Sequence, residues 1–115
     1  MKVWLLYSSY DDGLTYESQG YKYLSKVVDS EEKAKQWAFD KAIEECDKRI
    51  HSVSESRKYL EKLDKYDLII KEFDDELYYY DCQLNSFQLG DKSYVVHDPN
   101  GYESYSYYYE VREVE

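Results

Sequence analysis

Residues 29–63 of the chain are DSEEKAKQWAFDKAIEECDKRIHSVSESRKYLEKL, and the start of this stretch contains the clearest local signal in the sequence, that of a helix. Asp29 or Ser30 can cap the free backbone N–H groups at a helix start, and the two glutamates that follow suit the positive end of the helix dipole. Apolar side chains then recur mostly at three- and four-residue steps, which predicts one amphipathic helix. The members of this apolar stripe are Ala34, Trp37, Ala38, Ile43, Cys46, Ile50, Val53, Leu60 and Leu63.

Two interpretations of this helix stay open. If it were unbroken to Asp64, it would be about 50 Å long at 1.5 Å per residue, which is too long for a small domain to cover. Residues 52–56 (SVSES) are poor helix interior and good cap material, so we expect a turn there into a helical hairpin. Alternatively the helix protrudes, and the stripe from Ile43 to Leu60 pairs with a second copy as a homodimer. The residues of this stripe follow the heptad spacing of a coiled coil, but they include Arg57, and a charged residue in the seam between two helices weakens this alternative.

Segments that favour β-structure lie on both sides of the helix. Residues 3–7 are apolar and β-prone, and residues 21–28 alternate in the manner of a second strand. Turn signals at residues 11–13 and at Gly20 separate the two segments. The simplest arrangement is an antiparallel hairpin that precedes the helix.

The C-terminal part predicts further strands. Residues 68–77 fit either a helical face or a strand, whereas the run Tyr78-Tyr79-Tyr80 favours a strand. Residues 93–97 predict a strand, and Asp98-Pro99-Asn100-Gly101 predicts a tight turn because proline sets φ and Asn-Gly accepts positive φ. The last strand is expected over residues 102–114.

This order of elements predicts an α+β fold in which a small antiparallel sheet packs on one long or two antiparallel helices. We expect residues 1–115 to form a single domain. Charged residues make up 35% of the chain, but aromatic residues make up 18% and there is one proline, which is the composition of a folded protein and not of a disordered tail. The acidic half is therefore expected to be part of the fold.

The negative charge is concentrated at the C-terminal end. Residues 72–115 contain eleven carboxylates but only Lys92 and Arg112 as basic side chains, whereas residues 1–71 are close to neutral. Residues 72–115 also contain nine of the sixteen tyrosines. Such a surface repels nucleic acid and anionic membranes, and it attracts a basic partner through a field that salt screens.

No motif in the chain indicates catalysis. Gly-rich phosphate loops and serine nucleophile motifs are absent, and we expect no enzyme activity and no cofactor. The acidic run from Glu72 to Glu76 lacks the spacing of a calcium loop, so we expect no metal site. Cys46 and Cys82 are interpreted as two buried free thiols, and one disulfide stays possible in a secreted protein.

The tyrosines divide between the two sides of the expected sheet. Tyr105, Tyr107 and Tyr109 share one face of the last strand and are expected to point inward. Tyr108 is expected to face outward with Glu110. Three successive tyrosines at residues 78–80 cannot all point inward from one strand, so we expect some of them on the surface, where tyrosine is suited to protein interfaces.

An acidic, tyrosine-rich small chain without a catalytic motif resembles phage-encoded inhibitors of bacterial defence, of which anti-CRISPR proteins are the best-known group. Many of those proteins present carboxylates that imitate DNA phosphates and occupy the basic channel of a nuclease. The same composition is similar to that of immunity proteins, which neutralise a basic nuclease toxin. Carboxylates at the following positions carry the resemblance: Glu72, Asp74, Asp75, Glu76, Asp81, Asp91, Asp98, Glu103, Glu110, Glu113 and Glu115.

The resemblance implies a non-enzymatic inhibitor that binds a basic nucleic-acid-binding groove, most simply that of a CRISPR effector in the host cytoplasm. Its partner would be a basic protein, with no direct contact to nucleic acid or membrane. The residues expected to bind the partner are Glu72, Asp74, Asp75, Glu76, Tyr78, Tyr80, Asp81, Asp98, Glu103, Tyr108, Glu110 and Glu113.

Overall fold

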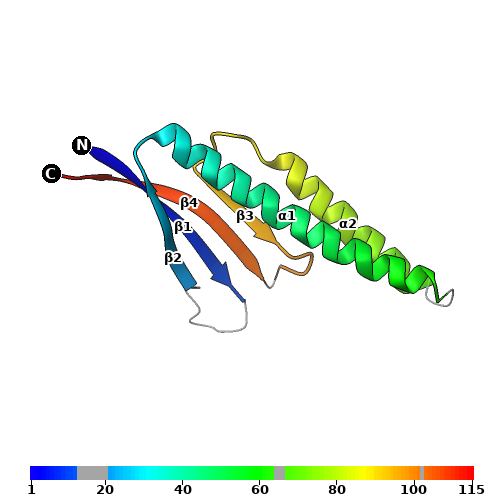
Figure 1. The fold of residues 1–115 in the computed structure, drawn as a ribbon. Helices are drawn as coiled ribbons and strands as arrows, with labels where there is room; N and C mark the ends of the chain where they lie inside the picture. The colour runs from blue at the N-terminus through cyan, green and yellow to red at the C-terminus, as the bar shows by residue number, and fades with distance from the viewer. Residues whose placement is uncertain (13–20, 64–66, 102) are drawn as a thin grey trace.

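The computed structural model describes residues 1–12, 21–63, 67–101 and 103–115. In chain order the elements are β1 (Lys2–Asp11), β2 (Tyr21–Val28), α1 (Glu31–Glu61), α2 (Asp67–Ser86), β3 (Ser93–His97) and β4 (Ser104–Glu113). They form an antiparallel sheet of order β2-β1-β4-β3 with two antiparallel helices on one face, which confirms the α+β prediction (Figure 1). The turn signals expected at Gly13 and Gly20 lie outside the described residues.

Strand β1 lies inside the sheet, paired with β2 on one side and with β4 on the other. Neighbouring side chains on a strand point to opposite faces, so Tyr105, Tyr107 and Tyr109 face the helices while Tyr108 faces the other side, as predicted. Tyr107 is buried. The pairing of β1 with β2 shifts between Leu6 and Tyr7, which is a β-bulge in this hairpin.

Helix α1 begins as the sequence predicts. The Ser30 hydroxyl accepts a hydrogen bond from the Lys33 backbone N–H at 3.2 Å. The turn expected at residues 52–56 is wrong, because α1 continues without a break to Glu61. Contacts to α2 override the weak helix propensity of these serines: the Arg57 Nε lies 2.6 Å from a carboxylate oxygen of Asp74.

Helix α2 contains Tyr78, Tyr79 and Tyr80, so the strand expected for this run is also wrong. Side chains that are at least half-buried repeat at three- and four-residue steps along α2 and give it one apolar face. The members of this face are Ile70, Phe73, Leu77, Tyr80 and Leu84. Burial of that face overrides the β-preference of the three tyrosines, since tertiary contacts outweigh local propensity.

The core lies where small side chains of α1 meet rings from the sheet. Ala34, Ala38, Ala42 and Cys46 are spaced by four residues, and all four are buried. Small residues at this spacing let the helix backbone approach the sheet closely, and the rings of the sheet then fill the space. The core cluster includes Ala38, Ala42 and Cys46 with Tyr94, Val96 and Tyr107 of the sheet.

The far end of the helix pair is a two-helix arm. Beyond Cys46, none of the described residues of α1 is buried, and Figure 1 shows both helices extending past the edge of the sheet. Cys82 on α2 is exposed, so the prediction of a buried thiol is confirmed for Cys46 and wrong for Cys82. No helix in the described part of the chain has the length and apolar character needed to cross a membrane.

Candidate acidic binding surface

A tight turn and helix α2 lie side by side at one end of the sheet. The backbone N–H of Gly101 donates to the Asp98 carbonyl at 3.0 Å, and Gly101 has φ of 75°, which glycine adopts without strain. The predicted turn is therefore confirmed. The amide side chain of Gln83 accepts from the His97 N–H at 2.9 Å and donates to the His97 carbonyl at 3.3 Å, which holds α2 against β3.

Between α2 and this turn is a hollow of about 540 Å³, which we call the acidic hollow. Its carboxylates are Glu72, Asp75 and Glu76, and no basic side chain is among the described residues that line it. The rings of Phe73 and Tyr79 supply apolar area beside the charges. The remaining lining residues come from the turn and are Pro99 and Asn100.

Glu72 and Glu76 of the hollow repel one another. Burial raises the pKa of Glu76 above its ordinary value of 4.5, and the charges of Asp98 and Glu72 raise it further. Two like charges at positions i and i+4 of a helix, such as Glu72 and Glu76, are destabilising by about 0.2–0.5 kcal/mol. The fold therefore holds negative charge together here at a cost in stability.

Helical spacing explains how α2 gathers these side chains. Glu72, Asp75, Glu76 and Tyr79 follow steps of three and four residues and so share one face of the helix. The sequence identified the acids but treated the tyrosines as strand, and it therefore missed Phe73 and Tyr79 as members of the site. Reading residues 68–80 as helix would have brought Tyr79 to the acidic face.

The other predicted residues on α2 do not join the hollow. Asp74 pairs with Arg57 of α1, and Tyr78 is 72% exposed beside Cys82. Asp81 is exposed. Tyr80 is 4% exposed, and its hydroxyl accepts a hydrogen bond from the Arg49 guanidinium at 3.3 Å. Its place is in the packing between the helices and not on an interaction surface.

The predicted residues of the last strand lie elsewhere. The open-face cluster, on the side of the sheet away from the helices, consists of Tyr7, Lys22, Tyr108 and Glu110. Tyr108 stacks on Tyr7 with ring centroids 5.4 Å apart. The Lys22 ammonium lies 4.2 Å from the Tyr7 ring centroid and 3.5 Å from a Glu110 carboxylate oxygen.

Two further predicted acids have partners at other points of the molecule. Glu113 lies 3.2 Å from the N-terminal ammonium of Met1. Glu103 accepts a hydrogen bond from the Tyr10 hydroxyl at 3.2 Å. The predicted set is therefore spread over several places, and the hollow brings together only Glu72, Asp75 and Glu76, with Asp98 beside them.

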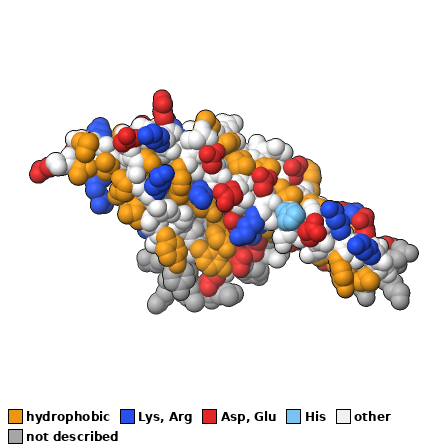
Figure 2. Space-filling view, in the orientation of Figure 1, with side chains coloured by type: hydrophobic (Ala, Val, Ile, Leu, Met, Phe, Trp, Pro, Cys, Tyr) orange, Lys and Arg blue, Asp and Glu red, His pale blue; other side chains and the backbone are white. Residues whose placement is uncertain are grey.

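A second concavity, which the sequence did not indicate, lies between α1 and the uncovered part of the sheet. We call it the aromatic groove; it has a volume of about 450 Å³. Figure 2 shows hydrophobic side chains on this face below α1, with basic and acidic side chains beside them. The rings that line the groove are Tyr10, Tyr23, Trp37, Tyr105 and Tyr107. They come from α1 and from separate strands, so no local pattern in the sequence could have grouped them.

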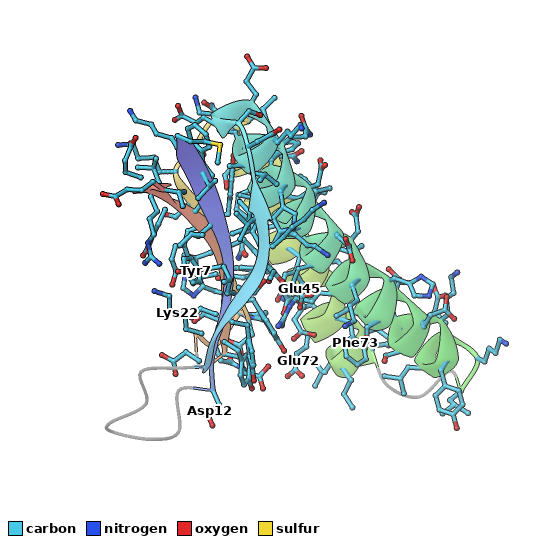
Figure 3. All side chains as sticks on the ribbon, turned by 60° about the vertical axis from the view of Figure 1, so that its left-hand side comes forward. Tyr7, Asp12, Lys22, Glu45, Glu72 and Phe73 are labelled. Atoms are coloured by element: carbon cyan, nitrogen blue, oxygen red, sulfur yellow. The ribbon has the colours of Figure 1, made fainter. Side chains whose placement is uncertain are left out.

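Charged side chains of α1 border the groove. Glu44, Glu45 and Lys41 line it together with Lys26 of β2. The pKa of the Tyr107 hydroxyl is raised, mainly by burial and in part by the negative charge of Glu45. Figure 3 shows Glu45 between the sheet and the helices, with Glu72 and Phe73 further along the helix pair. Tyr7 and Lys22 of the open-face cluster lie on the other side of the sheet in this view.

The geometry offers no metal centre in the part of the chain that the structure describes: no three His, Cys, Asp or Glu side chains there are arranged to hold an ion. Cys46 is buried, and burial raises the pKa of its thiol to about 11, which disfavours the reactive thiolate. Comparison of the chain with protein-family models, with curated proteins and with solved structures gives no match. The chemistry of the acidic hollow therefore has to be interpreted from its own residues.

Proposed function

We propose that the protein is a non-enzymatic inhibitor that uses the acidic hollow to bind a basic nucleic-acid-binding groove on another protein. In this proposal the carboxylates of Glu72, Asp75 and Glu76 take the positions that phosphates occupy in the partner's groove. Phe73 and Tyr79 supply contact area from which water is excluded, and aromatic residues of this kind often dominate interface energetics.

The observation that carries the proposal is the contrast between the hollow and the other acids of the C-terminal half. Asp74, Glu110 and Glu113 each lie within ion-pair distance of a cation of the same chain. The hollow gathers three carboxylates with no basic side chain among its described lining residues. A field of one sign in a concave site steers an oppositely charged partner and weakens as salt is added.

The identity of the partner rests on the compositional resemblance. Anti-CRISPR proteins indicate a CRISPR effector nuclease as the target, and immunity proteins indicate a bacterial nuclease toxin. Both targets present a basic groove for nucleic acid, so both fit the same acidic hollow. We take the CRISPR effector as the leading proposal.

Self-association through the stripe from Ile43 to Leu60 has less support. Within one chain, Cys46 is already buried and the other apolar members, Ile50 and Val53 among them, are half-buried. Arg57 of that stripe is engaged with Asp74 of α2. Little of the stripe is left to cover a second copy.

The experiment is a DNA-cleavage assay with purified CRISPR effector nucleases and nuclease toxins, with and without the protein. We expect inhibition of an effector that excess DNA relieves and that falls as salt rises. The variant E72K/D75K/E76K should weaken inhibition by about a hundredfold or more, because like charges across an interface cost several kcal/mol.

The matched control variant is D40K/D47K/E55K, which makes the same change of charge at exposed positions of α1. It should keep most of the inhibition. Equal losses in the two variants would mean that net charge acts and not the hollow. Full inhibition by E72K/D75K/E76K at low salt, or no inhibition of any nuclease in the set, would contradict the proposal. Inhibition of a toxin alone would assign the immunity-protein alternative.

A further inference from the structure

One guanidinium of the protein itself, that of Arg49, packs against two residues that line the aromatic groove. The guanidinium carbon of Arg49 lies 4.8 Å from the ring centroid of Tyr105, a lining residue, and its Nε lies 3.2 Å from a carboxylate oxygen of Glu45. This side chain is only 15% exposed, so the arrangement is partly shielded from water. In this fold a tyrosine ring and a neighbouring carboxylate thus bind a guanidinium together.

Further aromatic rings line the groove next to Tyr105. The indole of Trp37 lies edge-on against Tyr107, with ring centroids 6.2 Å apart, and the ring centroids of Tyr10 and Tyr105 are 4.8 Å apart. Trp37 is half-buried and reaches solvent. Trp and Tyr are the side chains whose faces attract cations most strongly.

Two carboxylates lie near this row of rings. Glu44 lines the groove, and its side chain is 72% exposed. Glu103 accepts a hydrogen bond from the hydroxyl of Tyr10, which is itself a lining residue. Lys41 lies 3.8 Å from Glu44, on a flexible and 43% exposed side chain, so an incoming cation can displace it. Lys26 also lines the groove, and its positive charge disfavours the binding of a cation.

We propose that the aromatic groove binds an arginine side chain of a partner protein, with the guanidinium stacked on the groove rings and paired with Glu44. That this arginine belongs to a basic nucleic-acid-binding protein rests on the proposed function. Such proteins carry arginines that contact phosphates, and the acidic hollow and the aromatic groove would then take two parts of one basic surface. Arginine and lysine are distinguished here, since only the planar guanidinium stacks on rings.

The probe is the tripeptide acetyl-Gly-Arg-Gly-amide, tested on the full chain in the W4F background, which leaves Trp37 as the single tryptophan. Binding is followed by the fluorescence of Trp37 and by the NMR signal of its indole N–H. We expect saturable changes at millimolar peptide. The matched peptide with citrulline in place of arginine has the same shape without the charge, and it should bind about threefold to tenfold more weakly.

Variants of the rim test the sign of the charge preference. Glu44→Gln should weaken the binding of the arginine peptide by about threefold or more, because the carboxylate that pairs with the guanidinium is removed. Lys41→Gln should strengthen its binding, because a competing cation is removed. The opposite signs, or equal binding of the citrulline peptide, would overturn the proposal and indicate a groove for neutral or anionic ligands. Far-UV circular dichroism of each variant checks that the fold is retained.

The two proposals fail in different ways. In the variant E72Q/E76Q, which alters only the acidic hollow, the response of Trp37 to the peptide should be unchanged. Loss of that response would show that the peptide binds at the hollow, which overturns the groove assignment and leaves the inhibitor proposal standing. If instead the nuclease assay fails while the peptide result holds, the groove binds arginine but the partner belongs to another class of protein.

Discussion

The acidic hollow and the open-face cluster both contain carboxylates that the sequence predicted to bind a partner, but they use the charge in opposite ways. In the open-face cluster Glu110 pairs with Lys22, which also lies over the Tyr7 ring. In the hollow, burial raises the pKa of Glu76, and the negative charges of Asp98 and Glu72 raise it further. The charge of Glu110 in the open-face cluster is therefore balanced within the chain, whereas the charges of Glu72 and Glu76 in the acidic hollow repel one another.

This contrast separates acids that stabilise the fold from acids whose charge is available to a partner. A carboxylate whose charge is already balanced by a neighbouring cation offers little net field to another molecule. Like charges held together cost stability, and selection retains such a cost most readily where function needs it. Fold stability and partner binding should therefore respond in opposite directions in these two regions.

The largest expected effect on stability is at Tyr108. The substitution Tyr108→Ala removes the stacked pair with Tyr7 and the ring that Lys22 approaches, and we expect a loss of about 2 kcal/mol in the free energy of unfolding. Tyr79→Ala in the hollow should cost under about 1 kcal/mol in stability and should weaken inhibition instead. Urea unfolding followed by circular dichroism measures both. Similar losses of stability would remove the distinction between the regions.

Neutralising the acids should change stability with opposite signs. E72Q/E76Q should raise the free energy of unfolding by about 0.5 kcal/mol, because it removes a like-charge pair at i and i+4. Glu110→Gln should lower it by a few tenths of a kcal/mol, the usual size for an exposed ion pair. Thermal unfolding at low salt is the measurement. Destabilisation by E72Q/E76Q would show that these carboxylates have stabilising partners.

The pH dependence of stability should show the same contrast on a smaller scale. The folded state raises the pKa of Glu76, so its contribution to stability is present below the ordinary pKa of 4.5 and is lost as pH rises through the folded pKa. The advantage of Glu76→Gln over the parent protein in melting temperature should therefore grow between about pH 4 and pH 7.

Asp29 provides a control of opposite sign. The hydrogen bond that its carboxylate accepts from the Lys33 ammonium lowers the pKa of Asp29, so the contribution of Asp29 to stability is present at neutral pH and is lost as pH falls. The deficit of Asp29→Asn in melting temperature should be largest at neutral pH and should shrink in acid. If both variants followed the same pH trend, the assignment of these two pKa shifts would be wrong.

The sequence predicted most of the fold because its strongest signals are local. The Ser30 cap, the alternation in residues 21–28 and the turn at residues 98–101 each depend on a few neighbouring residues, and each is confirmed. The predictions failed where burial against a distant element decides. Residues 52–56 stay helical and Tyr78 to Tyr80 become helical because α1 and α2 pack on each other.

The candidate site could be predicted in part for the same reason. Composition identified the carboxylates, but it could not tell that Asp74 is paired with Arg57 while Glu76 lies beside Asp98. These neighbours come from different elements, so only the tertiary structure separates them. The aromatic groove was missed entirely, since Trp37 of α1 and Tyr10 of β1 line it from elements that are distant in sequence.

An NMR titration of the isotope-labelled protein with the candidate nuclease tests whether the acidic hollow is the surface that binds the partner. The account predicts that the signals of Glu72, Phe73, Glu76 and Tyr79 shift or broaden on binding, while those of Tyr7 and Tyr108 on the open face stay unchanged. Changes confined to the open face, with the acidic hollow unaffected, would contradict it.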